Sequence, residues 1–169
     1  MVSKILTTHV GSLPRSKQLS EYLFAKDKGE KIDNEKFENI LISNVDQIVK
    51  RQLEVGIDFI SDGEMSKISY ATYIKDRIDG FSGESERRAP ADLDDFPEYK
   101  EKIANSGGTP TYSRPCCTKE LKIKDEDSLL NDINNFNKSL KKSNHTKAFM
   151  NAASPGVINV FMPNKYYIN

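Results

Sequence analysis

The sequence predicts an α/β fold in which four short strands alternate with helices, about half of a (β/α)8 barrel, built as one domain from residues 1–169. Two observations predict it. A strongly amphipathic helix runs directly into a short apolar segment, which is typical of a parallel sheet. Polar, glycine-containing turns follow three of the apolar segments, as expected where strands end. A chain of 169 residues with 37% hydrophobic and 30% charged residues suits a single soluble core.

Composition narrows the class of partner. Lys and Arg number 25, as do Asp and Glu, so the formal net charge is zero and we expect neither nucleic acid nor a membrane surface as a partner. The N-terminus lacks the apolar core of a signal peptide, and we expect a cytoplasmic protein. Two adjacent cysteines, Cys116 and Cys117, fit a reducing compartment. Adjacent thiols with no nearby His or Cys seldom complete a tetrahedral metal site, so packing is favoured over metal binding.

The first elements are a strand and a modest helix. Residues 5–8 combine Ile-Leu with two β-branched threonines, which predicts a short buried strand that ends at the Gly-Ser-Leu-Pro turn. A helix is expected from Pro14, since proline suits a first helical turn, and Gly29 ends it.

The second helix is the clearest element. Asp33 can cap it, and Gly56 closes it with the left-handed conformation common after helices. Its apolar residues recur at three- and four-residue steps: Phe37, Ile40, Leu41, Val45, Ile48, Val49 and Leu53. The segment "IDFISDGE" follows Gly56 and is too short for a helix, so it predicts a buried strand that leaves through Asp-Gly.

The second half alternates less clearly. Residues 82–110 are charged and rich in Gly and Pro, which predicts an irregular insertion. A strand or hairpin is possible in residues 111–123, and a helix is expected over residues 125–142 from the stripe Leu129, Leu130, Ile133, Phe136 and Leu140. A final strand in residues 147–153 ends at Ser154, which can terminate the strand or face a pocket.

The strand ends predict a binding site. Carboxyl ends of parallel strands meet on one face, so "HVGS", "SDGE" and "NAASPG" would face one ligand. Gly11 lets the backbone turn sharply, and Ser12 can donate hydrogen bonds to a carboxylate. Glu64 offers the opposite charge to an ammonium. Together these residues would bind a zwitterion.

Three motifs resemble those of the cobalamin-independent methionine synthase family. They are "TTHVGSLPRS", "VGIDFISDGEMSK" with the following "SYATYIKDRIDGF", and "NAASPGVINVF", which occur in the family's order across nearly the whole chain. The similarity is to the catalytic domain, in the N-terminal half of its TIM barrel. The motif "THVGSLPR" is more similar to that of short, stand-alone relatives, because the classical synthases usually have an apolar residue in place of His9.

The resemblance implies a function. Members transfer a methyl group from 5-methyltetrahydrofolate, as the polyglutamate, to homocysteine, whose thiol a barrel-bound zinc holds as thiolate. By motif match, Gly11 and Ser12 hold the amino acid carboxylate and Glu64 holds its ammonium. Some relatives act on another thiol such as coenzyme M, so the acceptor stays open. The candidate substrate-binding residues are His9, Gly11, Ser12, Glu64 and Ser154.

The sequence lacks residues that match the family's zinc ligands. The family's zinc ligands, a His-x-Cys pair, a Glu and a second Cys, come from later strands and have no match here. We therefore expect a truncated half that alone binds no zinc and transfers no methyl group. The alternative is a non-catalytic half-barrel that serves as a binding or oligomerising module. Because a half-barrel leaves sheet edges unpaired, we expect a homo-oligomer or a missing C-terminal half as partner.

The site residues also have structural interpretations. Gly11 and Ser12 could form a simple turn, and His9 could be a hydrogen-bonded structural residue. Asp62 and Glu64 could cap the next helix.

Overall fold

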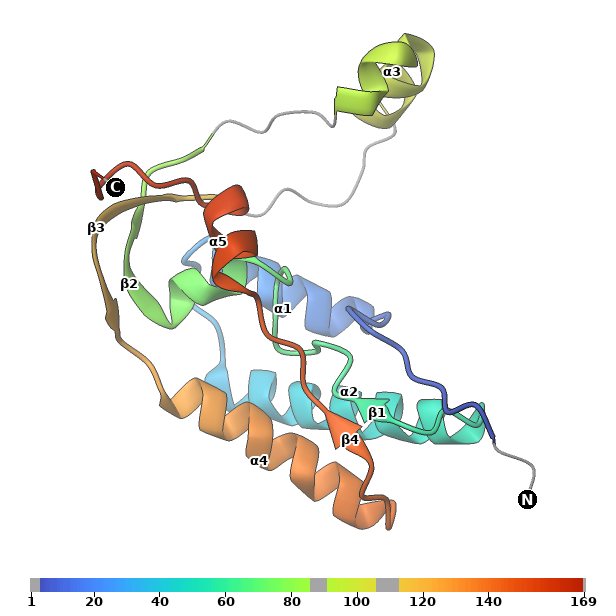
Figure 1. Ribbon diagram of the computed structural model, residues 1–169. Helices are drawn as coiled ribbons and strands as arrows, with labels where there is room; N and C mark the ends of the chain where they lie inside the picture. The colour runs from blue at the N-terminus through green and yellow to red at the C-terminus, as the bar shows by residue number, and fades with distance from the viewer. Residues whose placement is uncertain (1–3, 86–90, 106–112, 169) are drawn as a thin grey trace.

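The computed structural model describes residues 4–85, 91–105 and 113–168. These residues form α-helices, two short 3-10 helices (η) and four strands (Figure 1). In chain order the elements are α1 (Lys17–Asp27), α2 (Asn34–Glu54), β1 (Ile60–Ser61), η1 (Thr72–Asp76), β2 (Ile78–Ser82), η2 (Ala91–Asp95), α3 (Pro97–Asn105), β3 (Cys116–Ile123), α4 (Asp127–Lys142), β4 (Ala148–Phe149) and α5 (Pro155–Phe161).

Three chain segments run parallel at the centre. Thr8 forms an isolated parallel bridge with Phe59, and β1 pairs in parallel with β4, with Ile60 opposite Ala148. Helices α1 and α2 connect the first segment to β1, and α4 precedes β4. The expected alternation of strand and helix is therefore confirmed for these segments.

The other two strands form a separate antiparallel pair. Strand β2 pairs with β3, with Ile78 opposite Ile123 and a bulge at Gly80. Gly80 has a φ of 108°, and a Cβ there would lie 2.8 Å from a backbone oxygen, so the bulge requires glycine. The strand expected in residues 111–123 exists as β3, but it lies outside the parallel sheet. The prediction of four alternating parallel strands is wrong, since three parallel segments occur in the described residues.

The excursion between β2 and β3 contains regular structure that was not expected. Residues 91–105 hold η2 and α3, so the prediction of an irregular segment is wrong there, whereas residues 86–90 and 106–112 lie outside the described residues. Helix α3 projects away from the rest of the protein in Figure 1. The site described below does not involve it.

Helices α1, α2 and α4 pack with β1 around the main core. The buried apolar residues of this core are Leu19, Leu23, Phe37, Leu41, Val45, Val49, Ile60, Met65, Phe136 and Leu140. The predicted ends of α2 are confirmed: the Asp33 side chain accepts a hydrogen bond from the Lys36 N–H at 3.0 Å, and Gly56 has a φ of 81°.

A glutamine of α2 completes the hydrogen bonding of β1. The Gln52 amide donates to the Ser61 carbonyl at 2.8 Å and accepts from the Ser61 N–H at 3.1 Å. Gln52 is 3% exposed, and Ser61 is fully buried. The side chain therefore acts as a neighbouring strand would, because buried backbone groups need partners.

Two expectations about the N-terminal region are wrong. The first segment is not buried, since Ile5 is 88% and Leu6 49% exposed, and its one β-bridge within the described residues joins Thr8 to Phe59. Helix α1 begins at Lys17 rather than Pro14, because the Ser16 side chain caps it by accepting from the Leu19 N–H at 3.2 Å.

Helix α4 has nearly the expected bounds but a different buried face. Phe136 and Leu140 are buried, as the apolar stripe predicts. The other three residues of that stripe, Leu129, Leu130 and Ile133, are exposed. The reason is that buried Asp132 forms an ion pair with Arg77 and turns a partly polar face inward.

No helix in the described part of the chain is both long and apolar enough to cross a membrane.

Candidate functional site

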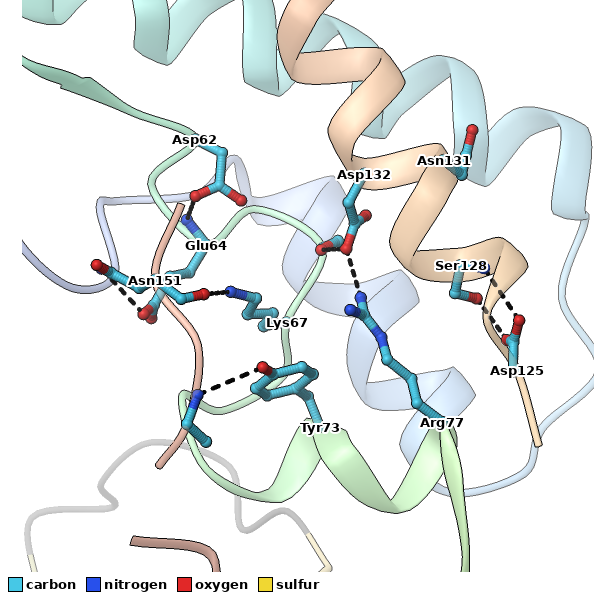
Figure 2. A network of polar contacts seen from close by, with 12 residues as sticks. Asp62, Glu64, Lys67, Tyr73, Arg77, Asp125, Ser128, Asn131, Asp132 and Asn151 are labelled. Carbon is cyan, nitrogen blue, oxygen red and sulfur yellow. Dashed lines mark hydrogen bonds and ion pairs between the residues drawn. The ribbon is translucent and has the colours of Figure 1, made fainter. Parts of the chain in front are cut away.

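Three loops meet at the carboxyl ends of the parallel segments. Residues 9–15 follow Thr8, residues 62–67 follow β1, and residues 150–154 follow β4. Both oxygens of the Glu64 carboxylate accept hydrogen bonds from the other loops: Ser12 Oγ donates to Oε2 at 2.5 Å, and Asn151 Nδ2 donates to Oε1 at 3.4 Å. Figure 2 shows Asn151 beside Glu64. The structure thus brings together two predicted residues, Ser12 and Glu64.

The first loop lies along the second. The Leu13 N–H donates to the Gly63 carbonyl at 3.0 Å. Two residues further on, Arg15 Nη2 donates to the carbonyls of Glu64 at 2.8 Å and Lys67 at 2.7 Å. Gly63 allows this close approach, since a Cβ on it would lie 3.0 Å from Leu13 Cβ and 2.9 Å from Met65 Cε. Main-chain contacts therefore fix the two loops relative to each other.

Lys67 joins the second loop to the third. It is 2% exposed, and its ammonium donates to the Asn151 carbonyl while lying 4.9 Å from the centre of the Tyr73 ring. The Tyr73 hydroxyl in turn accepts from the Ala153 N–H at 3.5 Å (Figure 2). Asn151 therefore contacts Lys67 through its backbone and Glu64 through its side chain.

The buried charges of the site are not paired with each other. Glu64 is 3% exposed and Asp62 is also buried. The ion pairs of 4.0 Å or less among the described residues include neither Arg15 nor Lys67, because both cations donate to carbonyls instead. The hydrogen bonds to the Glu64 carboxylate in the described residues come from neutral donors only, so no cation there donates directly to it.

Burial also shifts two pKa values. Burial raises the pKa of the Asp62 carboxyl, opposed by Lys67 and by the hydrogen bond from the Glu64 N–H. Burial lowers the pKa of Arg15, opposed by the charges of Glu64 and Asp62. Arginine nevertheless stays protonated in proteins, so the guanidinium keeps its charge.

The interpretation of Asp62 and Glu64 as helix caps is wrong. Asp62 Oδ1 accepts from the Glu64 N–H at 3.2 Å, which closes a turn, and the next helix, η1, begins only at Thr72. Glu64 itself has a φ of 57°, the left-handed region that residues with a Cβ rarely adopt. Such strain is concentrated at functional sites in proteins.

The remaining predicted residues lie nearby with other contacts. Gly11 has a φ of 93°, so the turn requires glycine. His9 is half-buried and makes no hydrogen bond to the described residues. Ser154 caps α5, where its Oγ accepts from the Val157 N–H at 3.2 Å. A substrate contact for His9, Gly11 or Ser154 stays a prediction.

Three residues of the site were not identified from the sequence: Arg15, Lys67 and Asn151. Each lies in one of the motifs quoted above, in the loop that follows one of the parallel segments, and this position was the available signal. However, the Arg15 guanidinium and the Lys67 ammonium donate hydrogen bonds to backbone carbonyls, and no residue pattern reveals such contacts.

The described residues offer no cluster of donors for a metal ion. In the described ranges, no three His, Cys, Asp or Glu side chains converge in a way that could hold a metal ion. Cys116 and Cys117 are buried in β3, in the antiparallel pair, where Cys116 Sγ lies 3.8 Å from the Glu84 carbonyl and Cys117 Sγ 3.5 Å from the Lys119 carbonyl. This donor set does not fit a zinc site, so no step below involves a metal.

Comparisons with known proteins point to one family. The model of the family described as "Cobalamin-independent synthase, Catalytic domain" matches residues 5–89, half of the chain. A methionine synthase of Sulfolobus acidocaldarius is 29% identical over 161 residues, which cover 95% of this chain and 41% of that protein. A 5-methyltetrahydropteroyltriglutamate–homocysteine methyltransferase of Bifidobacterium longum subsp. infantis is 28% identical over 75 residues, 44% of this chain and 10% of that protein.

A solved structure shows the same fold. It is a B12-independent methionine synthase from Shewanella sp. W3-18-1 in complex with selenomethionine, with a TM-score of 0.61 and 16% sequence identity. The match covers 96% of this chain and 42% of that chain. The chain thus spans less than half the length of each of these relatives.

Proposed function

Because the chain belongs to the family of the cobalamin-independent synthase catalytic domain, we propose that it binds the amino acid substrate of a methionine synthase-type methyl transfer. Glu64 carries the proposal. Its carboxylate is buried at the junction of three loops and is held by two neutral donors, Ser12 and Asn151. An ammonium that replaces one of these contacts gains a charge-assisted hydrogen bond to a buried carboxylate.

Homocysteine is the proposed substrate. Relatives named as homocysteine methyltransferases support this choice over another thiol such as coenzyme M. The Ser12 N–H makes no hydrogen bond to the described residues, and it follows Gly11 in the turn that faces Glu64. We assign this N–H to the substrate carboxylate, together with the Ser12 hydroxyl, which turns from Glu64 to the substrate carboxylate when the ammonium takes its place at Glu64.

The methyl donor is proposed from the relatives alone. Their names specify 5-methyltetrahydropteroyltriglutamate, and we assign the same class of donor to the reaction in which this chain takes part. We further propose that residues 1–169 form the N-terminal half of a barrel, supported by the three parallel segments and by the match to part of a larger structure. A non-catalytic module is not favoured, since the relatives named above are methyltransferases.

A binding experiment tests the role of Glu64. L-Homocysteine is titrated, under reducing conditions, into the full chain and into Glu64→Gln, with binding followed by NMR. We expect a dissociation constant near millimolar for the unaltered chain. We expect Glu64→Gln to weaken binding by about 10- to 100-fold, because a hydrogen bond to a charged group is lost.

Two controls make the test specific. Glu21→Gln removes an exposed carboxylate of α1 and should leave affinity unchanged. The ligand 4-mercaptobutyrate lacks the ammonium, so Glu64→Gln should not weaken its binding. Equal homocysteine affinity in the unaltered chain and Glu64→Gln would contradict the proposal, as would a failure of the unaltered chain to bind homocysteine at all.

A further inference from the structure

One side chain connects the first loop to the backbone of Glu64. We infer that Arg15 is a positioning residue, whose guanidinium holds the turn of residues 64–67 so that the Glu64 carboxylate faces the loop that carries Ser12. This inference rests on the proposed function of Glu64. It assigns to Arg15 a role in ligand affinity without a contact to the ligand.

The hydrogen bonds define what Arg15 holds. Both hydrogens of Nη2 are engaged, one by the Glu64 carbonyl at 2.8 Å and one by the Lys67 carbonyl at 2.7 Å. The Lys67 N–H also donates to the Glu64 carbonyl, at 3.1 Å. One nitrogen therefore joins the two ends of the turn, and the turn's own hydrogen bond converges on the same oxygen.

The backbone of Glu64 needs such support. Its φ of 57° is unfavourable for a residue with a Cβ, and a conformation of this kind persists only where the surroundings enforce it. Gly63 before it also has a positive φ, of 62°. If Arg15 is removed, the Glu64 carbonyl keeps only the bond within the turn, and the turn is free to relax toward a common conformation.

Relaxation of the turn would reach the ligand through one group. Ser12 and Arg15 come from the same loop, and they hold the side chain and the carbonyl of Glu64 respectively. A rotated Glu64 backbone carries the carboxylate away from Ser12 Oγ. Arg15 itself donates to main-chain carbonyls, and no described carboxylate lies within ion-pair distance of it.

A double-mutant cycle tests this inference. Homocysteine dissociation constants are measured by NMR titration for the unaltered chain, Arg15→Met, Glu64→Gln and the variant with both changes. We expect Arg15→Met to weaken binding by about 10-fold in the unaltered background. In the Glu64→Gln background we expect less than about 2-fold, because a residue that acts only through Glu64 has nothing left to position. A residue that supports the fold generally would weaken binding equally in both backgrounds.

Two further variants complete the design. Arg15→Lys keeps the charge and one nitrogen able to donate to two carbonyls on a shorter side chain, so we expect partial rescue. Arg51→Met removes an exposed arginine of α2, paired with Glu54, and should leave binding unchanged. If Arg15→Met does not fold, as judged by circular dichroism, the same cycle is run with Arg15→Lys.

The outcomes separate the inference from the proposed function. If Glu64→Gln does not weaken binding, the proposed function fails. If Glu64→Gln weakens binding but the loss from the Arg15 variant is equal in both backgrounds, or is absent, the role assigned to Arg15 is wrong and the role of Glu64 stands.

Discussion

Replacement of Gln52 by a residue of similar size should destabilise the protein, because buried hydrogen bonds are lost. The amide of this α2 residue makes two hydrogen bonds to the backbone of Ser61, at 2.8 and 3.1 Å, in a fully buried part of β1. Gln52→Met keeps the length and the apolar part of the side chain but leaves the Ser61 N–H and carbonyl without these partners. Each buried group left unpaired costs about 1–3 kcal/mol, so for the two groups we expect a loss of about 2–6 kcal/mol in the free energy of unfolding.

Urea unfolding measures this loss, with circular dichroism as the signal and the slope against urea checked for constancy. Gln47→Met is the matched control, because Gln47 lies on the exposed face of the same helix and bonds only the Ser43 hydroxyl, at 3.1 Å. We expect its effect to stay within about 0.5 kcal/mol. Gln52→Glu adds a second comparison, since a carboxylate still accepts from the Ser61 N–H but cannot donate to the Ser61 carbonyl. Equal midpoints for Gln52→Met and Gln47→Met would refute the reasoning that Gln52 substitutes for a strand.

Two further predictions concern pH and assembly. Burial raises the pKa of Asp62 in the folded state above its unfolded value near 4. The folded state therefore binds this proton more tightly than the unfolded state. The stability gained from protonated Asp62 at low pH is lost as the pH rises through the raised pKa. Asp62→Asn should therefore gain stability relative to the unaltered chain between pH 4 and pH 7 in urea unfolding, and a constant difference across this range would contradict the assignment. We also predict a dimer or larger species, because the edge of the parallel sheet exposes Ile5 and Leu6; a single monomer mass in light scattering at micromolar concentrations would show this to be wrong.

Local signals in the sequence were sufficient for the elements that carry them. Helix α2 has a capping aspartate, Asp33, a regular apolar period and a closing glycine, Gly56, and its bounds follow within a residue. The parallel direction of β1 and β4 follows from the expected alternation of strands and helices, but their direct pairing does not, because another strand of the same sheet was expected between them in residues 111–123. The same alternation placed Ser12 and Glu64 at one end of the sheet, where they form a hydrogen bond.

Contacts between residues far apart in the sequence could not be predicted from these local signals. Strand β2 contains Gly80 at a bulge, which hides any alternation of apolar residues, and its partner β3 lies more than 30 residues away. The exposed face of α4 depends on the ion pair between Asp132 and Arg77, which are 55 residues apart. The contacts of Arg15 and Lys67 to carbonyls depend on backbone geometry alone, so the sequence indicated neighbouring motifs but not these roles.

The two ends of the segment between β2 and β3 lie side by side, because Ser82 pairs with Cys116 in the ladder. The Arg77 carbonyl accepts from the N–H groups of Lys124 at 2.9 Å and Asp125 at 3.1 Å, and the first pair of the ladder joins Ile78 to Ile123. A segment whose two ends already touch can lengthen, shorten or be exchanged by recombination while the strands before and after it keep their places, because the cost of closing the loop changes slowly with its length. The segment between the two strands thus gives this fold a place where evolution, or an engineer, can insert a new module while the paired strands β2 and β3 are kept.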